Sequence, residues 1–186
     1  MLILYCGLSE YPNNKSASIN RYTSIAKAMK SNNEIIFINR IANKDISIHS
    51  PSHEFEFIDA CRINQSATNF FKRNFLKVYS LYSEYKVFKN ISKEKKIDWV
   101  NIYTQYFTLC LFYYLLSKVF KFKTIFHYVE LRSKAQNRSL YFKLNDLLYD
   151  RFVCYLFDIY IPISNLLNNR LKSYNPKCNS IIVPPI

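Results

Sequence analysis

Hydrophobic residues along this chain gather in short runs, and most runs are followed by a segment in which apolar residues recur at helical spacing. Residues 1–6 form the first apolar run, and residues 18–30 follow with a helical pattern. Short apolar runs are typical of buried strands, and helical spacing is typical of amphipathic helices. The opening therefore predicts a strand, a polar loop and a helix. The helix side chains expected to face a core are Ile25, Ala26, Ala28 and Met29.

The same alternation continues to the end of the chain. The further strands predicted by the pattern are residues 34–39, 54–58, 97–103, 123–129, 158–163 and 180–183. The further helices are residues 68–93, 106–119, 140–157 and 164–173. Residues 54–58 alternate enough to form an edge strand, and residues 40–53 are predicted to be a loop. Strands that alternate with helices favour a parallel sheet covered on both faces.

Open parallel sheets bind their ligands beyond the carboxyl ends of the strands. In this chain the rule selects residues 7–18, 104–106 and 130–138, together with the turn that begins at Ser164. These four places are therefore the predicted ligand-binding positions.

The loop after the first strand lacks the glycines that usually bring backbone N–H groups close to a phosphate. Gly7 is the only glycine in the protein. The loop offers Asn14, Lys15 and Ser16 instead. These side chains can hold an anionic group at the helix N-terminus, or they can simply cap the helix and face water.

Polar side chains also occupy the first turn of that helix and the end of the strand at 97–103. Asn20 and Arg21 lie in the first turn, where a cation opposes the helix dipole but where a guanidinium suits bidentate binding of phosphate. Tyr103, Thr104 and Gln105 end the strand with hydrogen-bonding groups that suit recognition of a sugar.

A carboxylate follows the strand at 123–129. Glu130 can accept hydrogen bonds from an acceptor hydroxyl or act as a base, or it can form an ion pair with Arg132 or Lys134. His127 lies inside the strand and is predicted to be a core residue. Ser164 is predicted foremost to cap the last helix, with a hydroxyl that can also face the ligand.

The net charge indicates which classes of partner the protein attracts, and the cysteines indicate the redox compartment. The net charge is +13, from 26 basic and 13 acidic residues, which attracts nucleic acid, acidic lipid headgroups or phosphorylated substrates. The five cysteines are scattered without metal-ligand spacing, which favours free thiols in a reducing cytoplasm.

No signal-peptide pattern precedes the first strand, and the apolar run at 106–120 predicts a buried helix because it is short for a membrane span. Asp98 and Asp158 are predicted to begin strands and cap turns.

Residues 70–96 combine aromatic with basic side chains. We predict that their aromatic stripe packs on the sheet while the lysines face water, with contact to an anionic membrane surface as the alternative. The stripe consists of Phe71, Phe75, Val78, Tyr82 and Tyr85.

Five segments, taken in order, resemble the N-terminal half of a GT-B-fold glycosyltransferase of the retaining, glycosyltransferase-1-like group. They are ILYCG with its polar loop, SINRYTSIAKAMKSNNEIIFIN, IDWVNIYTQ, KTIFHYVELRS, and DIYIPISNLLNNRL leading to SIIVPPI. The last pair is the most specific, because such domains are connected to a second domain through a short strand that ends in Val-Pro-Pro. The chain departs from the group in lacking a glycine pair after the first strand.

The resemblance implies a Rossmann-like three-layer α/β/α fold with a mostly parallel sheet, in which residues 1–186 form one acceptor-side domain and the donor-binding C-terminal domain is absent. It implies sugar transfer from a nucleotide-sugar donor to a glycan or lipid-linked acceptor, in cell-surface polysaccharide synthesis. The expected location is the cytoplasm or the inner face of the membrane. From their places after the strand at 123–129, we predict Glu130 as the catalytic residue and Arg132 among the substrate-binding residues. We expect no cofactor and no metal, and no activity from this part alone.

Two other functions stay open. One is a non-catalytic partner or scaffold subunit that docks a separate catalytic protein. The other is a basic nucleic-acid-binding α/β domain, which the charge favours, although the sequence contains no RNP-like aromatic motif, helix-turn-helix signature or zinc spacing.

Overall fold

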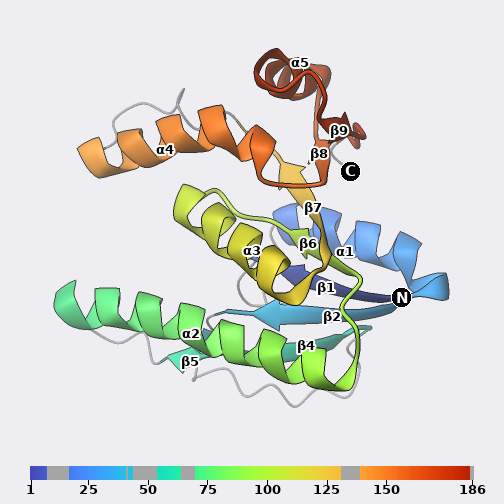
Figure 1. Cartoon of the computed structure of the whole chain (residues 1–186), viewed down its shortest axis with the longest axis vertical. Coiled ribbons are helices and arrows are strands. Elements are labelled where there is room, and N and C mark those ends of the chain that lie inside the picture. Colours follow the sequence, from blue (N-terminus) through green and yellow to red (C-terminus); the bar gives the residue numbers. More distant parts are fainter. Residues whose placement is uncertain (8–16, 41, 44–53, 64–69, 131–138, 185–186) are drawn as a thin grey trace. The chain divides into compact units, whose positions relative to one another are not determined.

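The computed structural model describes residues 1–7, 17–40, 42–43, 54–63, 70–130 and 139–184. The chain forms two compact units, Met1–Asp98 and Trp99–Ile186. In each unit, parallel strands alternate with helices along the chain (Figure 1).

Three parallel strands of the first unit pair in the order β4-β2-β1. The elements of this unit are β1 (Leu2–Cys6), α1 (Ala17–Met29), the 3₁₀ helix η1 (Lys30–Asn32), β2 (Glu34–Asn39), β3 (Ala42–Asn43), β4 (Glu56–Asp59), β5 (Arg62–Ile63) and α2 (Phe70–Glu94). Leu4 pairs with Ile36, and Phe37 pairs with Phe57. The strand β4 ends the order, so the predicted edge position is confirmed.

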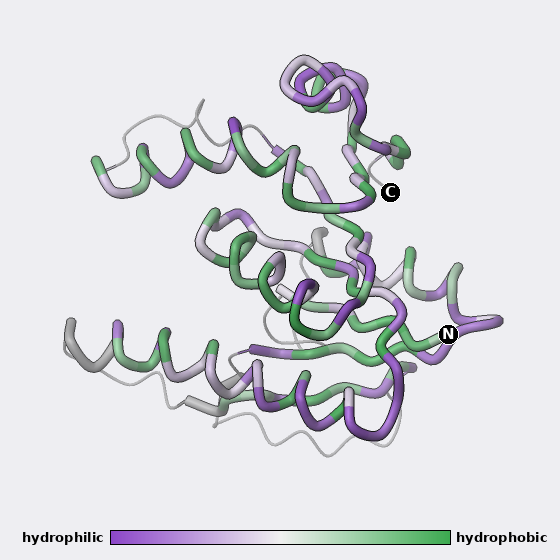
Figure 2. The backbone as a smooth tube through the Cα atoms, viewed as in Figure 1, coloured by the Kyte–Doolittle hydropathy of each residue, from purple (hydrophilic) through white to green (hydrophobic). Residues whose placement is uncertain are grey.

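The core of the first unit is aromatic. All five residues of β1 are buried, and β1 and β2 are coloured as hydrophobic over most of their length in Figure 2. The Tyr5 ring lies 4.7 Å from the Tyr22 ring, edge to face, and 4.9 Å from the stacked Phe37 ring. Phe37 also contacts Phe55, at a centroid distance of 5.3 Å. These ring contacts pack α1 against β1 and β2.

The buried face of α1 is rotated from the prediction. The α1 residues that are buried at this face are Ile19, Tyr22 and Ala26. Ala26 is therefore confirmed as a core residue, whereas Ala28 is exposed and Ile25 and Met29 are half-buried. Ala28 is exposed because successive helix residues are turned by about 100°, which places it far from the direction of Ala26.

A second, two-stranded parallel sheet was not predicted. In it β3 pairs with β5, with Ala42 opposite Arg62 and Asn43 opposite Ile63. The predicted loop is therefore wrong at residues 42–43, while residues 44–53 lie outside the described residues. Strands of two residues have no periodicity to read, so tertiary pairing alone defines them.

Four parallel strands of the second unit pair in the order β6-β7-β8-β9. The elements are β6 (Trp99–Ile102), α3 (Phe107–Phe120), β7 (Lys123–Tyr128), α4 (Leu140–Phe152), the 3₁₀ helix η3 (Val153–Tyr155), β8 (Ile159–Pro162), α5 (Asn165–Tyr174) and β9 (Asn179–Ser180). Pairing extends beyond β9, because Ile181 N donates to Tyr160 O over 2.9 Å and Val183 N donates to Pro162 O over 3.1 Å.

Two aspartates hold the starts of strands, as predicted. The Asp98 carboxylate accepts a hydrogen bond from Leu2 N over 2.9 Å, and Asp98 N donates to Leu2 O over 3.1 Å. The Asp158 carboxylate accepts from both the backbone N and the hydroxyl of Thr124, over 2.8 and 2.7 Å. Both aspartates therefore have structural roles at the edge opposite the carboxyl ends of the strands.

The helix α3 is buried on one face only, so the prediction of a buried helix is only partly right. The buried residues of α3 are Leu109, Cys110, Tyr113, Leu116 and Ser117. Leu115 and Val119 are each 60% exposed. A helix that is apolar nearly all round does not reveal from its pattern which side packs.

The helix α2 forms where it was predicted, but the prediction that its aromatic stripe packs on the sheet is wrong. The buried residues in the described part of this helix are Ser80, Glu84 and Phe88. The predicted core residues that are exposed instead are Phe75, Val78 and Tyr82. Tyr85 is half-buried, and the Phe71 side chain lies outside the described residues. The helix thus packs through a face that carries a serine and a glutamate, and it presents its aromatic face outward.

The predicted Rossmann-like α/β class is confirmed by the parallel pairing within each unit and by helices that connect successive strands. Element boundaries differ from the sequence prediction by a few residues, as the short strand β6 illustrates.

Candidate functional site

The carboxyl ends of the strands carry polar groups in the first unit. Gly7 follows β1 with φ of 90°, a conformation that other residues adopt at a cost. The Tyr22 hydroxyl, from α1, donates to Cys6 O over 3.1 Å. At the ends of β2 and β4, Asn39 Nδ2 donates to Asp59 Oδ1 over 2.9 Å. Hydrogen bonds therefore hold polar groups in place at these strand ends.

Two charged side chains are buried in the same unit. Arg21, in the first turns of α1, is 6% exposed, while its predicted companion Asn20 is exposed. Glu84, from α2, is fully buried. Burial raises the pKa of the Cys6 thiol well above its ordinary value of 9.0, and the Glu84 carboxylate raises it further. The Glu84 carboxylate is therefore near the carboxyl end of β1.

Glu84 was missed by the sequence analysis. A carboxylate that is buried near the carboxyl end of a strand is a candidate for binding, because perturbed ionisable groups gather at functional sites. Its signal in the sequence was weak: one acid in the middle of a basic, aromatic helix. From the sequence alone, Glu84 is expected to be a solvated charge, because the orientation of the helix is not known.

Four predicted residues lie outside the described residues. They are Asn14, Lys15, Ser16 and Arg132. Their predicted contact with substrate stays a prediction.

In the second unit, the predicted residues Tyr103 and Thr104 lie just after β6, and Tyr103 contacts His127 of β7. Tyr103 is half-buried, and its ring lies 6.2 Å from the ring of His127 on β7. His127 is 1% exposed, so its predicted place in the core is confirmed. Thr104 is buried, and its hydroxyl oxygen accepts a hydrogen bond from Tyr106 N over 3.3 Å.

Asn145 of α4 fixes the turn after β6. Its Oδ1 accepts a hydrogen bond from Phe107 N over 2.9 Å, at the start of α3. Its Nδ2 donates to Gln105 O over 3.5 Å. The Gln105 backbone is thus tied down, while its half-buried side chain extends from a fixed turn. Asn145 was not predicted, because an asparagine inside a helix carries no sign of a contact 40 residues away.

Glu130 lies just beyond β7 and is half-buried. Burial raises the pKa of the Tyr149 phenol on α4, and Cys110, Tyr128, Asp150 and, least of all, Glu130 raise it further. Burial also raises the pKa of Tyr128, with a further contribution from Asp150. The Tyr149 phenol therefore stays protonated in the folded chain.

Ser164 performs its predicted structural role. It precedes α5 in an extended conformation, and its side-chain oxygen accepts a hydrogen bond from Leu167 N over 3.3 Å. This bond satisfies one of the free N–H groups in the first turn of the helix.

The described residues contain no group of three or more histidine, cysteine or acidic side chains arranged to hold a metal ion. In the same residues, no helix is long and apolar enough to cross a membrane. What the two carboxyl edges offer is hydrogen bonding and a few buried charges, which suits polyhydroxylated or anionic ligands.

No protein-family profile and no curated protein matches this chain in sequence. Several solved structures resemble it in fold, among them an epimerase and a plant UGT. UDP-GlcNAc 2-epimerase from Methanocaldococcus jannaschii matches with a TM-score of 0.51 and 14% identity, over 98% of this chain and 44% of that chain. The apo UGT2 of Phytolacca americana matches with a TM-score of 0.56 and 8% identity, over 98% of this chain and 51% of that chain. The likeness shows a GT-B-like fold, and the chain spans about half the length of each of these proteins.

Proposed function

We propose that this chain is the acceptor-side N-terminal domain of a glycosyltransferase that transfers a sugar from a nucleotide-sugar donor to a glycan or lipid-linked acceptor. The observation that carries the proposal is the half-buried Glu130 at the carboxyl end of β7, in a chain with a GT-B-like fold. The motifs that resemble the retaining group support the same function.

The nucleotide sugar is supported by the names of the similar proteins. One is an epimerase of UDP-GlcNAc, and a sugar nucleotide is accordingly the donor we propose here. We place the reaction in cell-surface polysaccharide synthesis, in the cytoplasm or on the inner face of the membrane.

In the proposed mechanism this chain binds and orients the acceptor. The Glu130 carboxylate accepts a hydrogen bond from the acceptor hydroxyl and takes its proton as that oxygen attacks the sugar. Tyr103, Thr104 and Gln105 hold neighbouring hydroxyls from a turn that Asn145 fixes. Arg21 and the loop residues Lys15 and Ser16 are proposed to bind an anionic group of the substrate.

The proposal treats residues 1–186 as a single N-terminal domain and assigns the donor to a second domain. That domain is part of the same natural polypeptide or of a separate one. Activity is therefore to be measured on the natural gene product, together with any partner that copurifies.

We expect Glu130→Gln to lower kcat/KM by about 10²- to 10⁴-fold, because the amide cannot take the proton. The measurement is UDP or other nucleotide release from a panel of nucleotide sugars with glycan and lipid-linked acceptors. Glu94→Gln is the matched control, since Glu94 is exposed at the end of α2. Unchanged turnover by Glu130→Gln, with the same melting temperature as the control, would exclude Glu130 as the base.

A further inference from the structure

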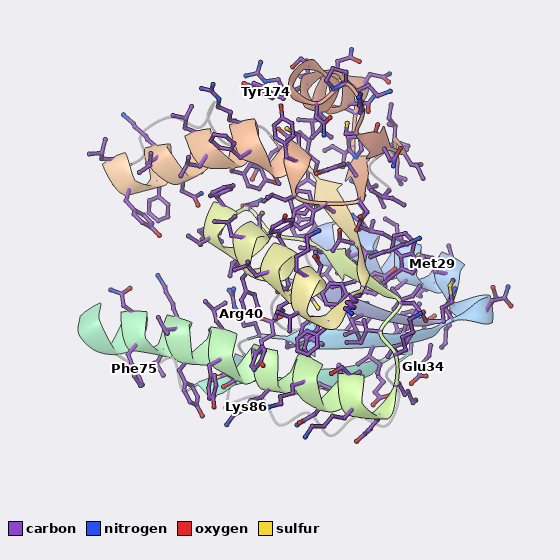
Figure 3. The ribbon with its side chains drawn as sticks, in the orientation of Figure 1. Met29, Glu34, Arg40, Phe75, Lys86 and Tyr174 are labelled. Carbon is purple, nitrogen blue, oxygen red and sulfur yellow. The ribbon has the colours of Figure 1, made fainter. Side chains whose placement is uncertain are left out.

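The outer side of α2 carries a continuous surface that the proposed function does not use. We name it the α2 outer face: Phe75, Val78, Tyr79 and Tyr82, followed by Lys86 and Lys89. Phe75 and Val78 are 68% and 67% exposed, and Tyr79 and Tyr82 are 49% and 53% exposed. Figure 3 shows Phe75 and Lys86 extending from the same side of the helix.

The helix does not need this face for its own packing. It is seated through Ser80, Glu84 and Phe88, which are spaced by four residues and are at most 1% exposed. Phe75, Tyr79, Tyr82 and Lys86 follow each other at spacings of three and four residues, so they line one side of the helix. The Phe75 and Tyr79 rings stack on each other at a centroid distance of 6.4 Å.

The face changes character along the helix. Its first half is apolar and aromatic, and its second half is lysine, with Lys86 Nζ 4.6 Å from the centroid of the Tyr82 ring at the junction. Figure 2 shows the last turns of α2 as hydrophilic. Over the whole helix, six basic residues stand against two acidic residues, and one of these acids is the buried Glu84. From Phe75 to Lys89 the face is about 21 Å long.

We propose that the α2 outer face docks on an anionic phospholipid bilayer. Phe75, Val78 and Tyr79 enter the boundary between headgroups and acyl chains, where aromatic side chains are favoured. Lys86 and Lys89 reach the lipid phosphates from the same side of the helix, with their alkyl stems lying along the surface.

Charge and chemistry together select this occupant. Exposed aromatic residues in such a row mark an interaction site, and the basic excess requires an anionic partner. A nucleic acid satisfies the lysines and can stack on the rings, but it does not cover Val78. A second copy of this face brings like charges together. An anionic bilayer satisfies the apolar half and the lysine half at once.

The inference concerns the first unit alone and does not depend on sugar transfer. It goes beyond the proposed function by assigning the membrane contact to one face of one helix. Because the test measures binding and not turnover, its outcome is independent of the Glu130 experiment.

The test is sedimentation of the chain with vesicles of phosphatidylcholine alone and of phosphatidylcholine with 30% phosphatidylglycerol, a composition of about the anionic content that recruits basic surfaces. We expect at least tenfold stronger partition to the anionic vesicles, and a loss of that preference in high salt. Phe75→Ser with Val78→Ser is expected to lower the partition coefficient at least tenfold. Lys86→Glu with Lys89→Glu is expected to do the same.

The matched control is Leu115→Ser with Val119→Ser, which removes two equally exposed apolar side chains from α3. We expect it to stay within twofold of the unaltered chain. Circular dichroism and the melting temperature check that every variant is folded. Equal partition of the variants and the unaltered chain would overturn the proposal. So would a dimer that dissociates in the Phe75→Ser, Val78→Ser variant, or stronger binding to an oligonucleotide than to the anionic vesicles.

Discussion

At the scale of single residues, the hydroxyl of Tyr149 is the group with the clearest energetic consequence. The side chain is fully buried on α4, and its hydroxyl has no hydrogen-bond partner in the part of the chain that the structure describes. A buried hydroxyl without a partner costs about 1–3 kcal/mol. A folded protein retains such a cost most readily where a ligand supplies the missing bond.

We expect Tyr149→Phe to raise the free energy of unfolding by about 1 kcal/mol, because the substitution removes the unsatisfied hydroxyl and keeps the ring. Urea unfolding measures the change. Tyr160→Phe is the matched control with the opposite expected sign, since the Tyr160 hydroxyl donates to Val153 O over 2.8 Å and accepts from Phe157 N over 2.9 Å. Equal destabilisation by both substitutions would contradict the prediction.

At the scale of elements, the end of α3 carries a specific cost. Lys121 closes this helix with φ of 57° and ψ of 38°, the left-handed conformation that glycine adopts most easily. The chain then enters β7 at Lys123. The tight change of direction requires this conformation whichever residue occupies the position.

We expect Lys121→Gly to stabilise the protein by about 0.5–1 kcal/mol, because glycine has no Cβ to oppose the left-handed conformation. Lys118→Gly, in the last turn of α3, is the control and is expected to destabilise by about 1 kcal/mol. Thermal unfolding of the two variants reports the difference. If both substitutions lower the melting temperature alike, the conformation assigned to Lys121 is wrong.

At the scale of the whole molecule, both units bury thiols in their neutral form, and the second unit also buries neutral phenols. Burial raises the pKa of Cys6 and Cys110 well above the ordinary value of 9.0 and raises the pKa of Cys154 to about 11. It also raises the pKa of Tyr149 and Tyr160 above the ordinary value of 10.0. The unfolded chain therefore releases these protons at a lower pH than the folded chain does.

We expect stability to be full below about pH 9 and to fall steadily as the pH rises to 11, since the unfolded state then binds fewer protons than the native state. Urea unfolding under reducing conditions at pH 8, 9.5 and 11 measures this decline. Tyr149→Phe is expected to make the decline shallower, because one of the responsible phenols is removed. A stability that is level from pH 8 to pH 11 would show that these groups are not buried.

The candidate site was predictable where a residue's role is local. Ser164 is a helix cap in the sequence and in the structure, and Asp158 was placed at the start of a strand by its neighbours in the chain. Glu84 and Asn145 were not predictable, because their roles depend on partners 78 and 38 residues away, namely Cys6 and Phe107. Predictions on Asn14, Lys15, Ser16 and Arg132 stay open.

By itself, the sequence determined the alternation of strands and helices, because a buried strand and an amphipathic helix impose different periods on neighbouring residues. The run at Glu34–Asn39 is an example, since the structure has the predicted bounds. Only the tertiary structure decided which face of each helix is buried. In α2 the buried residues are Ser80, Glu84 and Phe88, whereas the apolar stripe is mostly exposed. A pattern of side chains is a property of one helix, whereas burial depends on the surface that the rest of the chain presents to it.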